Sequence, residues 1–247
     1  MKKTSRVKWA LFALFIFVLG LAFFPLAKEK IIDGKFFKYS LKFLKEKKPG
    51  VAPIVKYFPF SRENSLKEWE EKILKGKVAY GVEKGGELSY VRAESKKTAS
   101  ALYYKIALDT KRNPVLSWRW RVDKFPKRSE PERIEDKKEE DFAARVYVIF
   151  PAAFFTGSRV IEYIWAETLP VGTHGVSGYS KNIKVLVVES GRSQEWRYEE
   201  RDICSDYVKL FGVPPHLDIG AIAFMTDADS TKTSAEAVYD EIKIGYK

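Results

Sequence analysis

Apolar and polar residues alternate with a period of two through most of the chain after residue 77, as they do in strands with one buried face. Turn-forming residues such as Lys84-Gly85-Gly86 and Asn113-Pro114 interrupt the alternation at short intervals. Strands are therefore predicted near residues 77–83, 87–94, 99–108, 114–122, 141–150, 159–167, 182–191, 194–203, 217–226 and 235–246. Ten short strands with few helices predict an all-β fold, a β-sandwich of jelly-roll-like form.

Two short helices are predicted beside these strands. Ser65 and Glu68 form a capping box, and Leu66, Trp69 and Ile73 follow at helical spacing, which predicts a helix from residue 65 to about residue 75. A second helix is predicted over residues 205–211, with Ser205 as its N-cap and Gly212-Val213-Pro214-Pro215 as its end.

The pattern is different at the N-terminus, where residues 10–27 carry no charge and follow Lys2, Lys3, Arg6 and Lys8. As a helix this run spans about 27 Å, close to the thickness of a bilayer core. Residues 1–27 are predicted to form one transmembrane signal anchor, and a signal peptide cleaved near Gly20-Leu21-Ala22 is the alternative. The protein is thus expected to be a single-pass protein of the bacterial inner membrane, with its domain in the periplasm or otherwise outside the cytoplasm.

Residues 28–56 are predicted to be a basic amphipathic juxtamembrane segment and linker, which lies on the membrane or alternatively docks on the domain. The domain itself is expected at residues 57–247. The net charge is +11, but residues 1–56 hold 13 Lys/Arg and 3 Asp/Glu, whereas the remainder holds 31 and 30. The domain is therefore nearly neutral, which excludes a nucleic-acid partner and makes the membrane the partner of the basic region.

Common catalytic motifs do not occur in the sequence. The single cysteine, Cys204, excludes an internal disulfide, and the two histidines, His174 and His216, stand in loop-like contexts. No nucleophile elbow, Walker loop or dinucleotide fingerprint is present. A pair of carboxylates could still serve a glycosidase, and candidates on predicted strands are Asp141, Glu162, Glu167, Glu189 and Glu199.

Several segments together resemble a known family. PVLSWRWRVDKFP, EEDFAARVYVIFP, KVLVVESG, EWRYEERDI with DYVKLFG, and GAIAFMTDAD occur in this order between residues 114 and 229. They resemble the bacterial family named domain of unknown function 3047, and the resemblance covers roughly residues 57–247. It implies an exported envelope protein with a β-sandwich related in shape to carbohydrate-binding jelly rolls, and it implies no reaction.

Strand alternation separates two faces in the centre of the domain. Leu116, Trp118, Trp120 and Val122 share one face, and Ala144, Val146, Val148 and Phe150 are expected inward with Phe142. If the two strands share a sheet, its other face carries Arg119, Arg121, Asp141, Arg145 and Tyr147. This set is the candidate ligand-binding site, because guanidinium groups bind anionic or hydroxyl-rich ligands and tyrosine stacks on sugar rings. A solvated charge ladder with Glu189 and Glu199 is the alternative.

Between these strands, residues 123–141 hold almost only charged residues and prolines, which predicts a solvated loop, either a lid or an inert excursion. Asp227 and Asp229 begin a sequence like a calcium loop but lack its glycine and final glutamate. They are candidate ligands of a structural calcium ion, which Asp240 or Glu241 could complete, and an Asx turn is the simpler alternative. No other cofactor is expected.

The sequence thus predicts a membrane-anchored envelope protein with a non-enzymatic module that binds an envelope glycan or a similar ligand. A carbohydrate-active hydrolase or lyase with paired carboxylates is one alternative. A structural or assembly domain is the other.

Overall fold

The computed structural model describes residues 53–247 except 62–64, 86–87, 139 and 153–156. The predicted anchor and most of the predicted juxtamembrane segment therefore lie outside the described residues. Among the residues that are described, no helix has the length and apolar character needed to cross a membrane.

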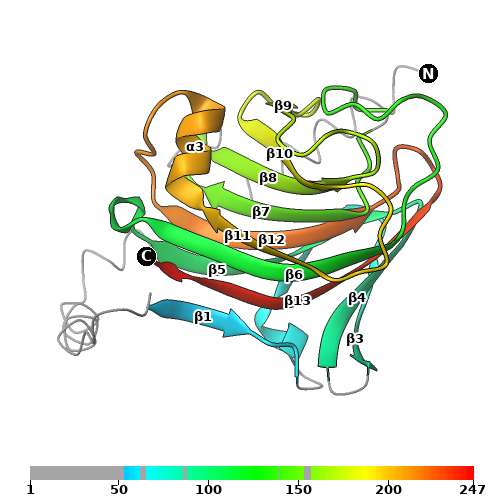
Figure 1. Ribbon diagram of the computed structural model, residues 1–247, viewed down its shortest axis with the longest axis horizontal. Helices are drawn as coiled ribbons and strands as arrows, with labels where there is room; N and C mark the ends of the chain where they lie inside the picture. The colour runs from blue at the N-terminus through cyan, green and yellow to red at the C-terminus, as the bar shows by residue number, and fades with distance from the viewer. Residues whose placement is uncertain (1–52, 62–64, 86–87, 139, 153–156) are drawn as a thin grey trace.

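The described residues form two sheets stacked face to face, and one α-helix among them lies at an end of the stack (Figure 1). The six strands of sheet A, in spatial order, are β11 (Arg197–Asp202), β6 (Pro114–Lys124), β13 (Ser234–Tyr246), β4 (Leu88–Lys96) and β3 (Ala79–Gly85), with β1 (Ile54–Phe58) paired to β13 as well. The seven strands of sheet B are β2 (Glu70–Lys75), β5 (Ala99–Leu108), β12 (Ile219–Asp227), β7 (Ala144–Phe150), β8 (Arg159–Ala166), β10 (Ile183–Ser190) and β9 (His174–Val176). Helix α3 spans Ile203–Phe211, and 3-10 turns lie at Ser65–Glu68 and Thr110–Arg112.

Strand pairs are antiparallel in both sheets, except β8 and β10, which are parallel. The first part of β13 pairs with β4 and its last part pairs with β1. The two parts are separated by an irregularity at which Glu241 adopts a φ of 48°. Close to the C-terminus, Gly245 is required because a Cβ atom there would lie 2.3 Å from the carbonyl oxygen of Pro53.

The core lies between the sheets and is rich in aromatic rings. Trp118 and Trp120 of β6 are fully buried, and their rings lie 5.4 Å from Tyr163 and 5.9 Å from Trp165 of β8, centre to centre. The inward face predicted for β6 is therefore confirmed. The inward face predicted for β7 is confirmed for Ala144, Val146, Val148 and Phe150, whereas Phe142 packs on the opposite side of sheet B.

The predicted mostly-β sandwich is thus confirmed, with corrections to both predicted helices. The helix at residues 205–211 exists as α3, but it begins earlier and its N-cap is Asp202, whose side chain accepts a hydrogen bond from the Ser205 amide. The helix predicted over 65–75 is wrong beyond its first turn. Residues 70–75 instead form the edge strand β2, paired with β5. Strand β1 crosses the boundary that the sequence placed at residue 57, since it begins at Ile54.

Candidate functional site

The structure divides the predicted ligand-binding set between two sheets. Arg119 and Arg121 lie on β6 in sheet A, whereas Arg145 and Tyr147 lie on β7 in sheet B. The condition behind that set, that the two strands share a sheet, is therefore not met. Arg119 and Arg121 are partly exposed on the outer face of sheet A, but Asp141, Arg145 and Tyr147 are at most 2% exposed.

Arg145 is the centre of a buried ion network on the outer side of sheet B. Its Nε and Nη2 donate to the two carboxylate oxygens of Asp227 at 2.9 and 2.8 Å, and its Nη1 donates to Glu162 Oε1 at 2.6 Å. Burial alone lowers the pKa of Arg145, but Asp227, Tyr147, Glu162 and Glu140 raise it well above its usual value. The guanidinium is therefore charged and holds β7, β8 and β12 together, and it is not available to a ligand.

Carboxyl groups outnumber cations around Arg145. Burial raises the pKa of Glu162, and Arg145 opposes this shift. Burial also raises the pKa of Glu140, and the neighbouring Glu162 raises it further. Glu140 accepts a hydrogen bond from the Ser177 hydroxyl. Two such carboxyl groups close together favour sharing one proton over carrying two charges.

The predicted calcium ligands Asp227 and Asp229 do lie together, and Asp141 joins them. Carboxylate oxygens of the three residues lie within 4.8 Å of one another, and all three residues are buried. Oxygen ligands of this kind suit Ca²⁺. However, Arg145 binds both oxygens of Asp227, and Lys75 Nζ lies 3.3 Å from Asp229 Oδ2, so two cations already offset much of the negative charge.

Asp141 has its own partners in this cluster. Its two oxygens accept hydrogen bonds from the Ser230 and Thr231 amides at 3.0 and 2.6 Å. The aspartates thus tie the turn after β12 to the start of β7, and a structural calcium ion stays a prediction.

The charged segment between β6 and β7 is folded onto sheet B, which corrects the expectation of a solvated loop. Ile134 and Phe142 of this segment pack with Val185 and Val187 of β10. Glu132 is 5% exposed, and the three amides of residues 167–169 donate to its carboxylate at 2.8 to 3.2 Å. Buried charges are tolerated here because each is paired or hydrogen-bonded.

A second loop, residues 177–182 after β9, completes this cover. The two loops approach so closely that a Cβ atom on Gly178 would lie 2.7 Å from the Glu135 carbonyl oxygen. Together they close most of the outer side of sheet B near Arg145.

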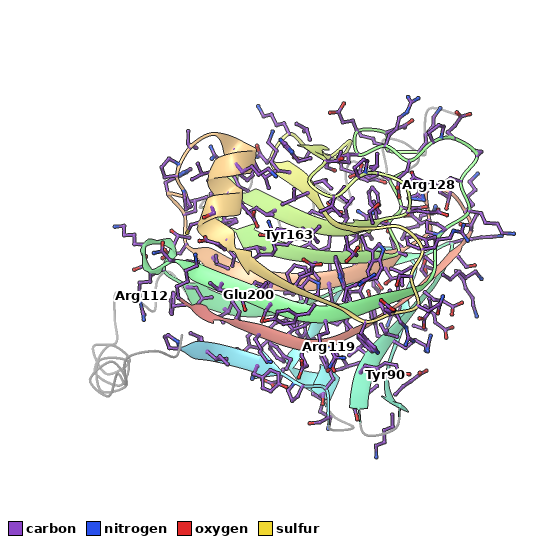
Figure 2. All side chains as sticks on the ribbon, in the orientation of Figure 1. Tyr90, Arg112, Arg119, Arg128, Tyr163 and Glu200 are labelled. Carbon is purple, nitrogen blue, oxygen red and sulfur yellow. The ribbon has the colours of Figure 1, made fainter. Side chains whose placement is uncertain are left out.

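The outer face of sheet A carries a different arrangement, the Trp196 platform, formed by Trp196, Arg119, Arg121 and Tyr90. The guanidinium carbons of Arg119 and Arg121 lie 5.2 and 5.4 Å from the centre of the Trp196 ring, and the Tyr90 ring centre lies 5.6 Å away. Figure 2 labels Arg119 and Tyr90, which lie near each other over β13 and β4. Trp196 is half-buried, so part of this residue is accessible.

Acidic side chains accompany the arginines of the platform. Arg121 Nε donates to Asp123 Oδ1 at 2.6 Å, and Arg92 Nη1 reaches the other oxygen of Asp123 at 2.8 Å. Arg119 has a weaker partner, with its Nη1 at 3.8 Å from Glu241 Oε2. The sequence offered no signal for Trp196, because neither its side chain's direction nor the sheet that contains β11 follows from local periodicity.

A carboxylate pair lies at one edge of the sandwich. In the strand register, Glu199 of β11 pairs with Trp118, and Glu189 of β10 pairs with Trp165. Each glutamate is therefore the register partner of a tryptophan that belongs to an inner face. Burial, and next the nearby Glu189, raise the pKa of Glu199 to about 7. This pairing could not be read from the sequence, since the two strands belong to different sheets.

The remaining reactive groups show ordinary surroundings. Cys204 Sγ donates to the Thr110 carbonyl at 3.1 Å, and burial raises the pKa of its thiol, which disfavours the nucleophilic thiolate. His174 is exposed, with Nδ1 3.0 Å from the Gly172 carbonyl oxygen.

A hollow of about 620 Å³ lies where the segment after β6 meets the ends of β8 and β10. Its lining includes Phe125, Lys127, Arg128, Pro131, Glu167 and Arg192. Its size is typical of small-molecule sites.

The chain belongs to the family described as "Protein of unknown function (DUF3047)", whose family model matches residues 67–243. The resemblance read from the sequence is therefore confirmed. No curated protein matches the chain.

Solved structures of similar shape are distant in sequence. One is the family 11 carbohydrate-binding module of the cellulosomal cellulase Lic26A-Cel5E of Clostridium thermocellum, with a TM-score of 0.43, 11% identity, and coverage of 81% of this chain and 97% of that chain. Another is the xyloglucanase domain of NopAA, a type three effector from Sinorhizobium fredii, with a TM-score of 0.42, 10% identity, and coverage of 72% and 93%. The family 30 carbohydrate-binding module of the Clostridium thermocellum cellulase Cel9D-Cel44B has a TM-score of 0.40, 10% identity, and coverage of 73% and 92%. At these values the likeness assigns neither a ligand nor an activity to this chain.

Proposed function

We propose that this protein is a non-enzymatic binding module of the bacterial cell envelope that holds a glycan on the outer face of sheet A. The observation that carries the proposal is the Trp196 platform, a half-buried Trp flanked by two guanidinium groups and a tyrosine. None of the described loops buries this sheet face in the way that sheet B is buried. An indole ring packs against the C–H face of a sugar, and guanidinium and carboxylate groups bond to hydroxyls.

Binding of soluble and insoluble polysaccharides by the full-length, detergent-solubilised chain tests the proposal. Trp196→Ala is expected to weaken binding about tenfold or more, in line with aromatic anchors in other interfaces. Trp196→Phe, which keeps a ring, is expected to retain most of the affinity. Val208→Ala, an exposed position on α3, serves as control. Equal binding by wild type and Trp196→Ala would exclude the platform as the glycan site.

Membrane attachment is part of the same proposal. It is supported by the uncharged run at residues 10–27 behind four basic residues. The protein is expected to stay in the pellet after alkaline carbonate extraction, and its domain is expected to be digested by protease added to spheroplasts. A domain protected in intact spheroplasts would contradict the proposed orientation.

A hydrolase or lyase is the second candidate, and the Glu199–Glu189 pair favours it. A carboxyl group whose pKa is near 7 can act as a general acid at neutral pH beside an ionised partner. Release of reducing ends from polysaccharides, abolished by Glu199→Gln, would establish this activity in place of simple binding. If the full chain neither binds nor cleaves any polysaccharide, the structural or assembly role is favoured.

A further inference from the structure

The hollow beside the segment after β6 is lined by a buried arginine at its floor and by apolar and acidic side chains at its walls. Arg128 belongs to its lining, and the Arg128 side chain is only 7% exposed. Figure 2 labels Arg128 at the end of the sandwich away from α3, and it lies apart from Arg119 and Tyr90. The hollow is thus a location separate from the Trp196 platform.

Arg128 is held in place by one side of its guanidinium group. Its Nη2 donates to the Asp141 carbonyl, and the same nitrogen lies 3.1 Å from Glu132 Oε1 in an ion pair. The Phe142 ring centre lies 5.5 Å from the guanidinium carbon. By contrast, Arg128 Nε and Nη1 are buried and have no acceptor among the described residues. Three of the five N–H groups of this arginine therefore remain uncommitted within the protein.

Glu132 does not fully neutralise Arg128. Its two oxygens also accept hydrogen bonds from the amides of residues 167–169 and from the Thr168 hydroxyl. A carboxylate that accepts several N–H groups is stabilised by them as well as by its cation. The unpartnered N–H groups of Arg128 are therefore a source of positive potential beneath the hollow.

The rim suits a ligand that also carries hydroxyl groups. Arg192 is 78% exposed, and its Nε donates to Glu167 Oε1 at 2.8 Å, so a guanidinium and a carboxylate stand side by side there. Phe125 and Pro131 supply apolar surface. Hydroxyl groups donate to carboxylates and accept from guanidinium groups, whereas a ring C–H face packs on apolar walls.

We infer that this hollow is a second binding site, and that its ligand is a sugar bearing a carboxylate, with the carboxylate directed to Arg128 and the hydroxyls to the rim. This site does not depend on the Trp196 platform, because the two share no residue.

Isothermal titration calorimetry with the full-length, detergent-solubilised chain tests this inference, with D-glucuronate, D-glucose, acetate and sulfate as separate titrants. Glucuronate is expected to bind at least about tenfold more tightly than glucose or acetate, since only it combines both features. Binding no tighter than that of glucose would overturn the carboxylate assignment. Acetate or sulfate binding as tightly as glucuronate would overturn the sugar assignment.

Two substitutions place the binding in the hollow. Arg128→Gln is expected to weaken glucuronate binding about tenfold or more. Arg192→Ala, at an exposed position where folding is unaffected, is expected to weaken it about threefold or more, because it also leaves Glu167 to repel the ligand. The matched control is Arg112→Ala, an exposed arginine at the other end of the sandwich (Figure 2).

If Arg128→Gln does not fold, Arg192→Ala decides the outcome, and unchanged affinity in Arg192→Ala would overturn the site. Trp196→Ala is expected to leave glucuronate binding unchanged, which separates a failure of this inference from a failure of the Trp196 platform.

Discussion

Arg121 in sheet A and Arg145 in sheet B both project from the outer face of a strand, and each donates two hydrogen bonds to an aspartate. Arg121 pairs with Asp123, two residues away on its own strand, and 22% of its side chain is exposed. Arg145 pairs with Asp227 of another strand and with Glu162, and it is 1% exposed. The same chemistry therefore gives a solvated surface in one sheet and a structural network in the other.

The cover over sheet B explains the difference. The loop between β6 and β7 and the loop of residues 177–182 remove water from around Arg145, whereas the outer face of sheet A keeps Trp196 and its arginines partly accessible. Low polarity strengthens every ionic contact around Arg145 and makes each unpaired charge costly. Of the two outer faces, that of sheet A is consequently the one expected to contact a ligand, and the buried network around Arg145 on sheet B is the one expected to be sensitive for folding.

Substitution of each arginine tests the difference between the two sheets most directly. Arg145→Met leaves the buried carboxyl groups of Asp227 and Glu162 without a cation, and is expected to lower the free energy of unfolding by about 3–5 kcal/mol. Arg121→Met is the matched change on sheet A and is expected to cost at most about 1 kcal/mol. Urea unfolding followed by tryptophan fluorescence measures both. Equal losses in the two variants would show that the cover over Arg145 has no energetic role.

The next largest effect is expected from pH. Burial raises the pKa of Glu199 to about 7 and that of Asp240 to about 6, and Glu140 also shifts upward. A carboxyl group with a raised pKa holds its proton more tightly in the folded state. Its contribution is therefore complete below its unfolded pKa of 4.5 and is lost as pH rises toward 7.

Each pKa unit corresponds to about 1.4 kcal/mol, so Glu199 alone would account for about 3 kcal/mol between pH 4.5 and 7. Melting temperatures across this range measure the loss, and Glu199→Gln is expected to flatten the profile. A wild-type stability that stays constant or rises from pH 5 to pH 8 would contradict this assignment of protons.

The sequence predicted the two faces of each central strand because alternation is a local property. Trp118 and Trp120 are inward as expected, and so are Val146 and Val148. Alternation carries no information about which strands are neighbours. Strands β6 and β7 follow each other in the chain but belong to different sheets, because the segment between them crosses from one sheet to the other. The predicted ligand-binding residues are therefore divided between two sheets.

Two further differences have physical causes of the same kind. The capping box at Ser65 does form a turn, but Glu70 to Lys75 pair with β5, and this tertiary pairing overrides the helical spacing of Leu66, Trp69 and Ile73. The composition of the charged segment before β7 predicts a solvated loop. Composition does not reveal that Arg128 pairs with Glu132, and this pairing makes both side chains compatible with burial.

The smallest effect on stability is expected at Arg119. Its side chain is 26% exposed and its acidic partner, Glu241, is 3.8 Å away, so Arg119→Ala should change the free energy of unfolding by about 0.5 kcal/mol or less. Its position against the Trp196 ring predicts a larger effect on binding, because a charge-assisted contact to a glycan is worth about 1.5–3 kcal/mol, roughly tenfold or more in affinity.

Polysaccharide binding and melting temperature should be measured together for wild type, Arg119→Ala and Arg119→Lys. A loss of affinity without a loss of stability would place Arg119 in the binding surface, and partial recovery by Arg119→Lys would show that charge contributes beside the planar guanidinium. Unchanged affinity with lowered stability would instead make Arg119 part of a structural charge ladder, and the ligand of this protein would then have to bind away from the Trp196 platform.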